Sequence, residues 1–186
     1  MFAVILFAVR SERPDTSAAP FMGGGPLAGT ASDISQLSPD EIVDRLFNRV
    51  MAAWGAGKTD SVDFFAPMAI NSFEALAPLT PHRRYDLGLI HLVSGQPAAA
   101  RAQADTILAG APKHLLGLTL ALRTAVVMDN ESDRKRFAAR FLDALKTESA
   151  RDLAEYNDHS TDITEATAAA EGRAGGSSAW VGPKRF

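Results

Sequence analysis

The feature that most constrains the fold of this chain is a self-similarity with a period of 34 residues through its middle. Small, bulky and helix-ending residues return in phase: Ala66 as Ala100, Pro78 as Pro112, Phe73 as Ile107 and Phe141, and Ile70 as Ala104 and Ala138. A period of this length is typical of arrays of helical hairpins. Such arrays bury a continuous core by stacking several units, and they build extended binding surfaces. The repeat therefore predicts a class of function without naming a ligand.

Helix-start and helix-stop signals between residues 38 and 157 predict six helices and a short seventh. The segment Ser38-Pro39-Asp40-Glu41 combines an N-cap, a first-turn proline and a capping-box glutamate. We expect helices over about 39–54, 60–76, 81–94, 97–110, 113–128 and 132–146, with Ser132 as a cap, and a short one over 149–156. No segment shows sustained period-two alternation, so the sequence predicts an all-α fold.

Composition divides the rest of the chain into an apolar start, a linker and a tail. The segment 1–10 consists of nine mostly apolar residues followed by Arg10. Nine apolar residues cannot cross a bilayer, because a membrane-spanning helix needs about 20. Three interpretations stay open: the end of a longer membrane helix, which we favour, a signal peptide without its basic segment, or an apolar tail. Residues 11–37 read as a flexible Gly/Pro/Ser linker, 38–157 as the repeat domain, and 158–186 as a tail that is partly helical and then disordered.

The middle unit, Tyr85 to Pro112, resembles a tetratricopeptide repeat. The resemblance rests on a large residue followed by glycine, a turn glycine, a small residue and a closing proline: Leu87, Gly88, Gly95, Ala100 and Pro112. The flanking units match the family pattern less well, and the resemblance covers roughly residues 38–147. It implies a right-handed stack of antiparallel helix hairpins whose first helices line a concave groove for a peptide or protein.

In that arrangement, polar residues on the helices are the candidates for contacting a partner. We select Arg84, His91, Arg123 and Asn71, and we assign the neighbouring leucines to the core. The small residues Gly88, Ala100 and Ala104 are expected to let the two helices of the middle unit approach closely.

The composition and motifs point away from several kinds of chemistry. The formal net charge is −3 with acids and bases interspersed, which does not predict a nucleic-acid-binding face. The chain has no cysteine, so disulfides and thiol chemistry are excluded. The four histidines show no paired spacing on one helical face, so we expect no metal site and no cofactor.

Two segments look like catalytic motifs without their context. The stretch ending in Gly57-Lys58-Thr59 resembles a phosphate-binding loop, but Ala52 replaces its first glycine and it follows a helix instead of a strand. The adjacent Asp158, His159 and Ser160 do not come from separate elements, as a catalytic triad requires. We therefore expect no catalytic residues.

The sequence thus predicts a non-catalytic scaffold that binds another protein, with a membrane tether through residues 1–10. The alternative is a structural or assembly factor that associates with itself at a membrane. A nucleotide-dependent enzyme built on Gly57-Lys58-Thr59 is a weaker rival.

Overall fold

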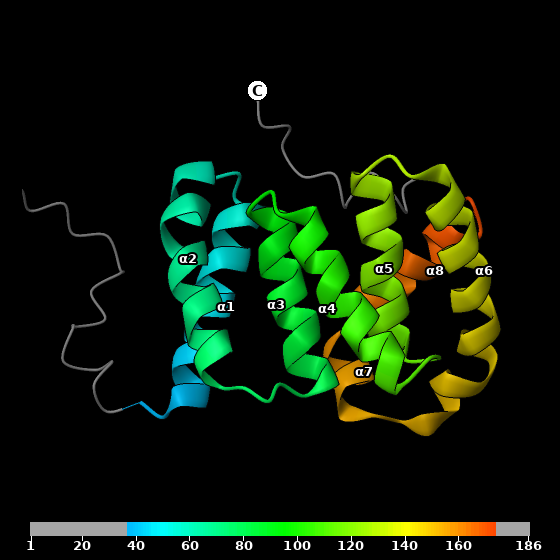
Figure 1. The fold of residues 1–186 in the computed structure, drawn as a ribbon, viewed down its shortest axis with the longest axis horizontal. Coiled ribbons are helices and arrows are strands. Elements are labelled where there is room, and N and C mark those ends of the chain that lie inside the picture. Colours follow the sequence, from blue (N-terminus) through cyan, green and yellow to red (C-terminus); the bar gives the residue numbers. More distant parts are fainter. Residues whose placement is uncertain (1–36, 174–186) are drawn as a thin grey trace, which may run out of the picture. The chain divides into compact units, whose positions relative to one another are not determined.

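The computed structural model describes residues 37–173, and within that range every regular element is a helix. The elements are α1 (Pro39–Gly55), α2 (Thr59–Ala75), α3 (Pro81–Val93), α4 (Pro97–Gly110), α5 (Leu115–Val127), α6 (Glu131–Glu148), the 3-10 turn η2 (Ser149–Arg151), α7 (Ala154–Asp158) and α8 (Ser160–Ala170) (Figure 1). The prediction of an all-α fold is confirmed. The predicted apolar start, nearly all of the linker, and the end of the tail lie outside the described residues.

Local capping explains where several helices begin. At α1 the Ser38 hydroxyl accepts a hydrogen bond from the Glu41 backbone N–H, while the Glu41 carboxylate accepts one from the Ser38 N–H. This reciprocal pair is the predicted capping box. At α6 the prediction is wrong by two residues: the cap is Asn130, whose side chain accepts from the Asp133 N–H at 3.0 Å.

Successive hairpins contact each other through both of their helices. The pairs α1/α2, α3/α4 and α5/α6 each pack together, and in addition α1 contacts α3 and α3 contacts α5 (Figure 1). The second helices join the stack through contacts of α2 with α3 and of α4 with α5. The first helices α1, α3 and α5 therefore lie next to one another in chain order.

The core consists of two clusters of buried side chains that meet at α3. One joins α1, α2 and α3 around Phe73, and the other extends from α3 to α8 around Phe137 and Phe141. Helix α5 is buried at every residue from Leu115 to Ala125, so it is the central helix of the second cluster. Burial all round explains why apolar residues occur on every side of this helix.

Gly88 allows α3 and α5 to approach closely. A Cβ atom built at this position would lie 2.2 Å from Cδ2 of Leu120, which is fully buried on α5. The sequence analysis assigned this close approach to the two helices of the middle hairpin, α3 and α4. The structure places it between consecutive hairpins instead, because Gly88 faces the next first helix.

The helical domain continues beyond the boundary predicted at residue 157. Helix α8 lies within the segment assigned to a tail, yet it packs against α5 and α6, and its Ala166 is fully buried. Before it, Asp152 adopts a left-handed conformation (φ 47°), which separates η2 from α7 and replaces the single short helix expected over 149–156. Tyr156 on α7 then anchors the turn: its hydroxyl accepts from the Leu115 N–H and donates to Glu148, both at 3.1 Å.

Over residues 37–173, none of the helices combines the length and apolar character that crossing a bilayer demands. The segment proposed as a membrane tether, residues 1–10, lies outside the described part of the chain.

Candidate functional site

The four residues selected from the sequence as partner contacts do not form one surface. Asn71 is exposed on α2, and Arg84 is half-buried on α3, where its guanidinium donates to the Gln103 side chain on α4 at 3.1 Å. His91 is only 7% exposed, and burial lowers its pKa. Arg123 on α5 is likewise 7% exposed. Helical spacing relates residues on one helix, but it does not show which neighbouring helix covers a given face.

Arg123 is covered by α8, which supplies two carboxylates to it. Its guanidinium donates to Asp162 at 2.5 Å and to Glu165 at 3.1 Å. The two acids are three residues apart, so they lie on the same side of α8. The residue chosen as a contact for another protein is thus used within the chain, to hold its C-terminal helix against α5.

A cleft opens beside this ion pair along the first helices of the hairpins. Its apolar lining comes from α1 and α3, and its charged lining from α5 and α8: Met51, Trp54, Leu89, Leu92, Val93, Arg123, Asp162 and Glu165. Trp54 and Leu92 are half-buried, so apolar surface is accessible there. The combination of apolar walls and one charged edge is common in sites that bind an extended or helical segment.

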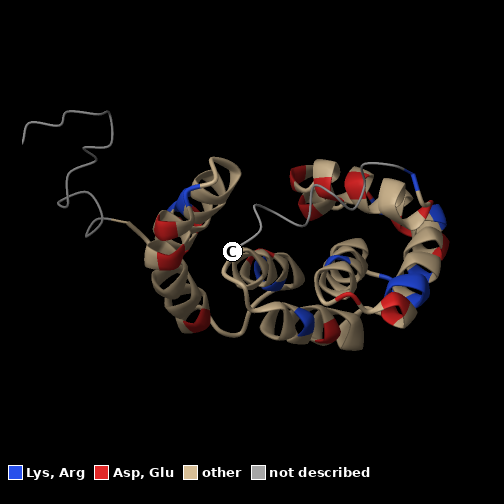
Figure 2. Ribbon diagram, turned by 90° about the horizontal axis from the view of Figure 1, so that it is seen from above, with Lys and Arg blue, Asp and Glu red and all other residues tan. Residues whose placement is uncertain are grey.

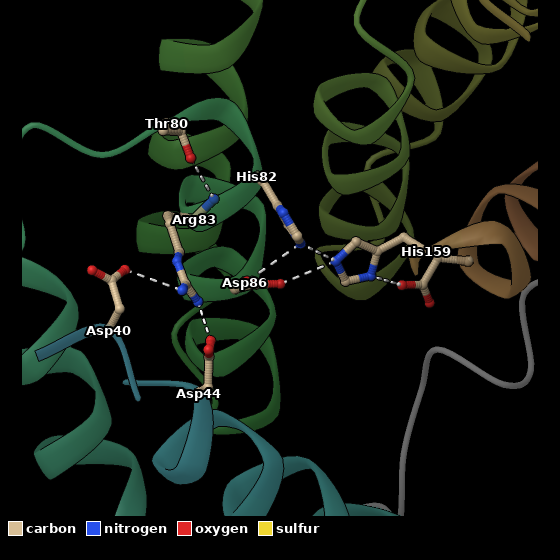
Figure 3. A network of polar contacts seen from close by, with 8 residues as sticks. Asp40, Asp44, Thr80, His82, Arg83, Asp86 and His159 are labelled. Carbon is tan, nitrogen blue, oxygen red and sulfur yellow. Dashed lines mark hydrogen bonds and ion pairs between the residues drawn. The ribbon is translucent and has the colours of Figure 1, made fainter. Parts of the chain in front are cut away.

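Three further polar side chains converge where α3 meets the start of α8 (Figure 3). His82 and Asp86 lie one turn apart on α3, and His159 is the residue between α7 and α8. The Nε2 atoms of the two histidines are 3.1 Å apart. The Asp86 carboxylate lies 3.1 Å from Nε2 of His159 and 3.7 Å from Nε2 of His82.

The charges around His159 stabilise its protonated form. Burial alone lowers the pKa of His159, but hydrogen bonds and ion pairs to Asp162 and Asp86 outweigh burial and raise the pKa to about 9. For Asp162, burial raises the pKa, whereas His159 and Arg123 together lower it to about 2. Tyr85, whose ring packs against His159, is fully buried, and this burial raises its pKa well above the usual value.

A neighbouring network fixes α3 to α1. Arg83 forms ion pairs with Asp40 and Asp44 of α1, and its backbone N–H donates to the Thr80 hydroxyl, which caps α3 (Figure 3). The hydrogen bond with Asp44 raises the pKa of Arg83. The first turn of α3 is therefore held on one side by α1, while His82 and Asp86 face His159 on the other.

The sequence analysis missed the cluster of His82, Asp86 and His159. The spacing of His82 and Asp86 is one helical turn and was a usable signal. His159 is 77 residues away from His82, and only the packing of α8 brings the two together. Histidine spacing was compared only within single helices. The cluster combines two residues of α3 with one residue between α7 and α8, so that comparison could not detect it.

The two segments that resemble catalytic motifs lie in the turn between α1 and α2 and at the junction of α7 and α8. Gly57, with φ +69°, forms part of the turn between α1 and α2, and Lys58 is exposed there. Of Asp158, His159 and Ser160, only His159 belongs to the polar cluster.

Basic residues are interspersed with acidic ones along the helices (Figure 2). On α6, Arg134 and Lys135 form ion pairs with Glu131, and Arg136 with Asp133.

In comparisons with known proteins, no family model, no curated protein and no solved structure matches the chain.

Proposed function

We propose that this chain is a non-catalytic binding module of tetratricopeptide type that holds a segment of another protein in the cleft along its first helices. The observation that carries the proposal is the cleft itself, whose apolar wall comes from α1 and α3 and whose charged edge comes from α5 and α8. The direct contacts of α1 with α3 and of α3 with α5 support a continuous surface across the hairpins.

The lining of the cleft indicates the chemistry of the partner. Met51, Trp54 and Leu92 offer apolar contacts, so the bound segment should carry apolar anchors at one-turn or alternate spacing. Arg123 is already paired with Asp162 and Glu165, so the charged edge offers mainly carboxylate oxygens. A basic or amide group at the end of the bound segment would complement that edge.

Affinity capture with the full chain as bait tests this function. We expect Leu92→Asp to abolish capture of the partner, because it places a charge in the apolar wall of the cleft. The matched control is Phe64→Asp, which makes the same kind of change on α2, where Phe64 is 67% exposed. Circular dichroism verifies that both variants are folded. Loss of the partner with both variants, or with neither, contradicts binding in the cleft.

A second function, self-association, is favoured by the exposed apolar side chains of α2. Phe64 and Met68 are 67% and 39% exposed and lie one turn apart on the same helix face. Two copies could bury this patch against each other, which would also suit an assembly factor. Sedimentation equilibrium distinguishes the two functions: self-association predicts a mass that rises with concentration, is lost in Phe64→Asp and persists in Leu92→Asp.

The apolar residues 1–10 complete the proposal as a membrane tether for the module. Cell fractionation tests this part separately. Deleting residues 1–10 should move the chain from the membrane fraction to the supernatant without changing capture of the partner.

A further inference from the structure

We propose that His82, Asp86 and His159 form a binding site for a divalent transition-metal ion of the zinc class. Within residues 37–173 this is the one place where three histidine or acidic side chains present potential ligand atoms within 4.8 Å of one another. The two histidines direct the same nitrogen, Nε2, toward a common point, and the Asp86 carboxylate faces that point from α3 (Figure 3).

The spacing of the three ligands fits tetrahedral coordination. Zinc binds imidazole nitrogen at about 2.0–2.1 Å and carboxylate oxygen at about 2.0–2.2 Å, so two ligands at a tetrahedral angle lie about 3.3–3.5 Å apart. The observed separations are 3.1 Å between the two nitrogens, 3.1 Å from His159 to Oδ1 of Asp86 and 3.7 Å from His82 to Oδ2 of Asp86, and one ligand atom from each residue lies within 4.8 Å of the other two. A rotation of the Asp86 carboxylate that turns one oxygen toward both nitrogens, with small shifts of the rings, would place all three residues at bonding distance from one ion.

The surroundings of His159 match those of a metal-binding histidine. Such a histidine commonly donates its second ring N–H to a carboxylate, which sets the tautomer and the ring orientation. Nδ1 of His159 lies 3.1 Å from Asp162, leaving Nε2 to face the other two ligands. Arg123 in turn holds Asp162 at 2.5 Å. The ring is therefore oriented before an ion arrives.

The ligand set indicates which ions the site would select. Two imidazoles and one carboxylate suit Zn²⁺, Co²⁺ and Ni²⁺, whereas Ca²⁺ and Mg²⁺ prefer sites made of oxygen ligands alone. The side chains of Asp86 and His159 are 6% and 11% exposed, but that of His82 is 32% exposed, so ion entry and a fourth, water ligand are available on the His82 side.

Binding there would connect α3 directly to the C-terminal helices. His82 and Asp86 belong to the middle hairpin, while His159 begins the segment that covers Arg123 and borders the cleft. A metal ion would therefore cross-link residues 77 positions apart and hold α8 in place. The site is independent of whether the cleft binds another protein.

Calorimetric titration of the tag-free full chain with ZnCl₂ tests the proposal. All four histidines of the chain lie within the described residues, so His91 and His114 are the two histidines outside the cluster. We expect one ion per chain, with affinity weakened more than about 100-fold in His82→Gln and Asp86→Asn, and about 10–100-fold in Asp162→Asn, which removes only the outer partner. His91→Gln, on the same helix but outside the cluster, should bind as the wild type does.

A measurement on the wild-type chain keeps the test decisive even if a variant fails to fold. Zn²⁺ should shift the imidazole ¹⁵N resonances of His82 and His159 and leave those of His91 and His114 in place. Equal binding of Mg²⁺, unchanged affinity in folded His82→Gln, or shifts at the other two histidines alone would overturn the proposal. Absence of stoichiometric Zn²⁺ binding would overturn it as well.

Discussion

Replacing Gly88 by alanine tests the close packing of α3 against α5. The added Cβ would lie 2.2 Å from Cδ2 and 3.1 Å from Cδ1 of Leu120, so that buried side chain must move within a filled core. Overpacking of this kind costs about 1–3 kcal/mol. Alanine in a helix interior returns about 1 kcal/mol relative to glycine. We therefore expect Gly88→Ala to reduce the free energy of unfolding by about 1 kcal/mol.

A double-mutant cycle with Leu120→Ala isolates the contact. In the Leu120→Ala background the clash is gone, so Gly88→Ala should stabilise by about 1 kcal/mol, which gives a coupling near 2 kcal/mol. Urea denaturation of the full chain provides each free energy. Gly55→Ala is the control, because a Cβ there meets no atom within 4 Å. A coupling below about 0.5 kcal/mol would refute the reasoning.

The remaining predictions concern α8 and the charged side chains that it covers. Arg123→Met should lower the free energy of unfolding by about 1–3 kcal/mol, since it removes the guanidinium from Asp162 and Glu165 and leaves only His159 as a cation at Asp162, and urea denaturation measures the loss. Ala166→Leu should cost about 1–3 kcal/mol and speed proteolysis after α7, because that alanine is fully buried; an unchanged cleavage rate would argue against tight docking of α8.

In metal-free buffer, the raised pKa of His159 contributes stability that is complete below about pH 6.5 and lost as pH rises through 9. The loss in the free energy of unfolding is on the order of 3 kcal/mol at most. His159→Gln should remove this dependence of the free energy of unfolding on pH. The lowered pKa of Asp162 contributes stability that is present above about pH 4 and lost as pH falls through 2. The groups that face His159 in this titration are His82, Tyr85, Asp86 and Asp162, and Arg123 lies behind Asp162.

Features set by neighbouring residues could be predicted from the sequence. The capping box at Ser38 involves residues three apart, and Gly95, with φ +78°, follows α3 in the predicted turn. The cap of α6 shows the limit of such signals. Ser132 and Asn130 are both good N-cap residues, and the choice depends on which side chain reaches the backbone N–H of the first turn.

Features set by distant residues could not be predicted in this way. The segment 158–186 is rich in alanine and glycine and carries no strong apolar stripe, yet α8 packs closely because Ala166 is small. That packing buries Arg123, which the resemblance to a tetratricopeptide repeat had made a candidate for contacting a partner. It also brings His159 to His82, and no local pattern connects residues 77 positions apart.

Photo-crosslinking in native cells tests the central claim, binding of another protein in the cleft, most directly. A photoreactive residue at Leu92 should form an adduct with another protein, while the same residue at Lys135, 74% exposed on α6 and outside the cleft, should not. An adduct between two copies of the chain from position 64 alone would favour self-association. Equal adduct yields at Leu92 and Lys135, or none at Leu92, would contradict the account.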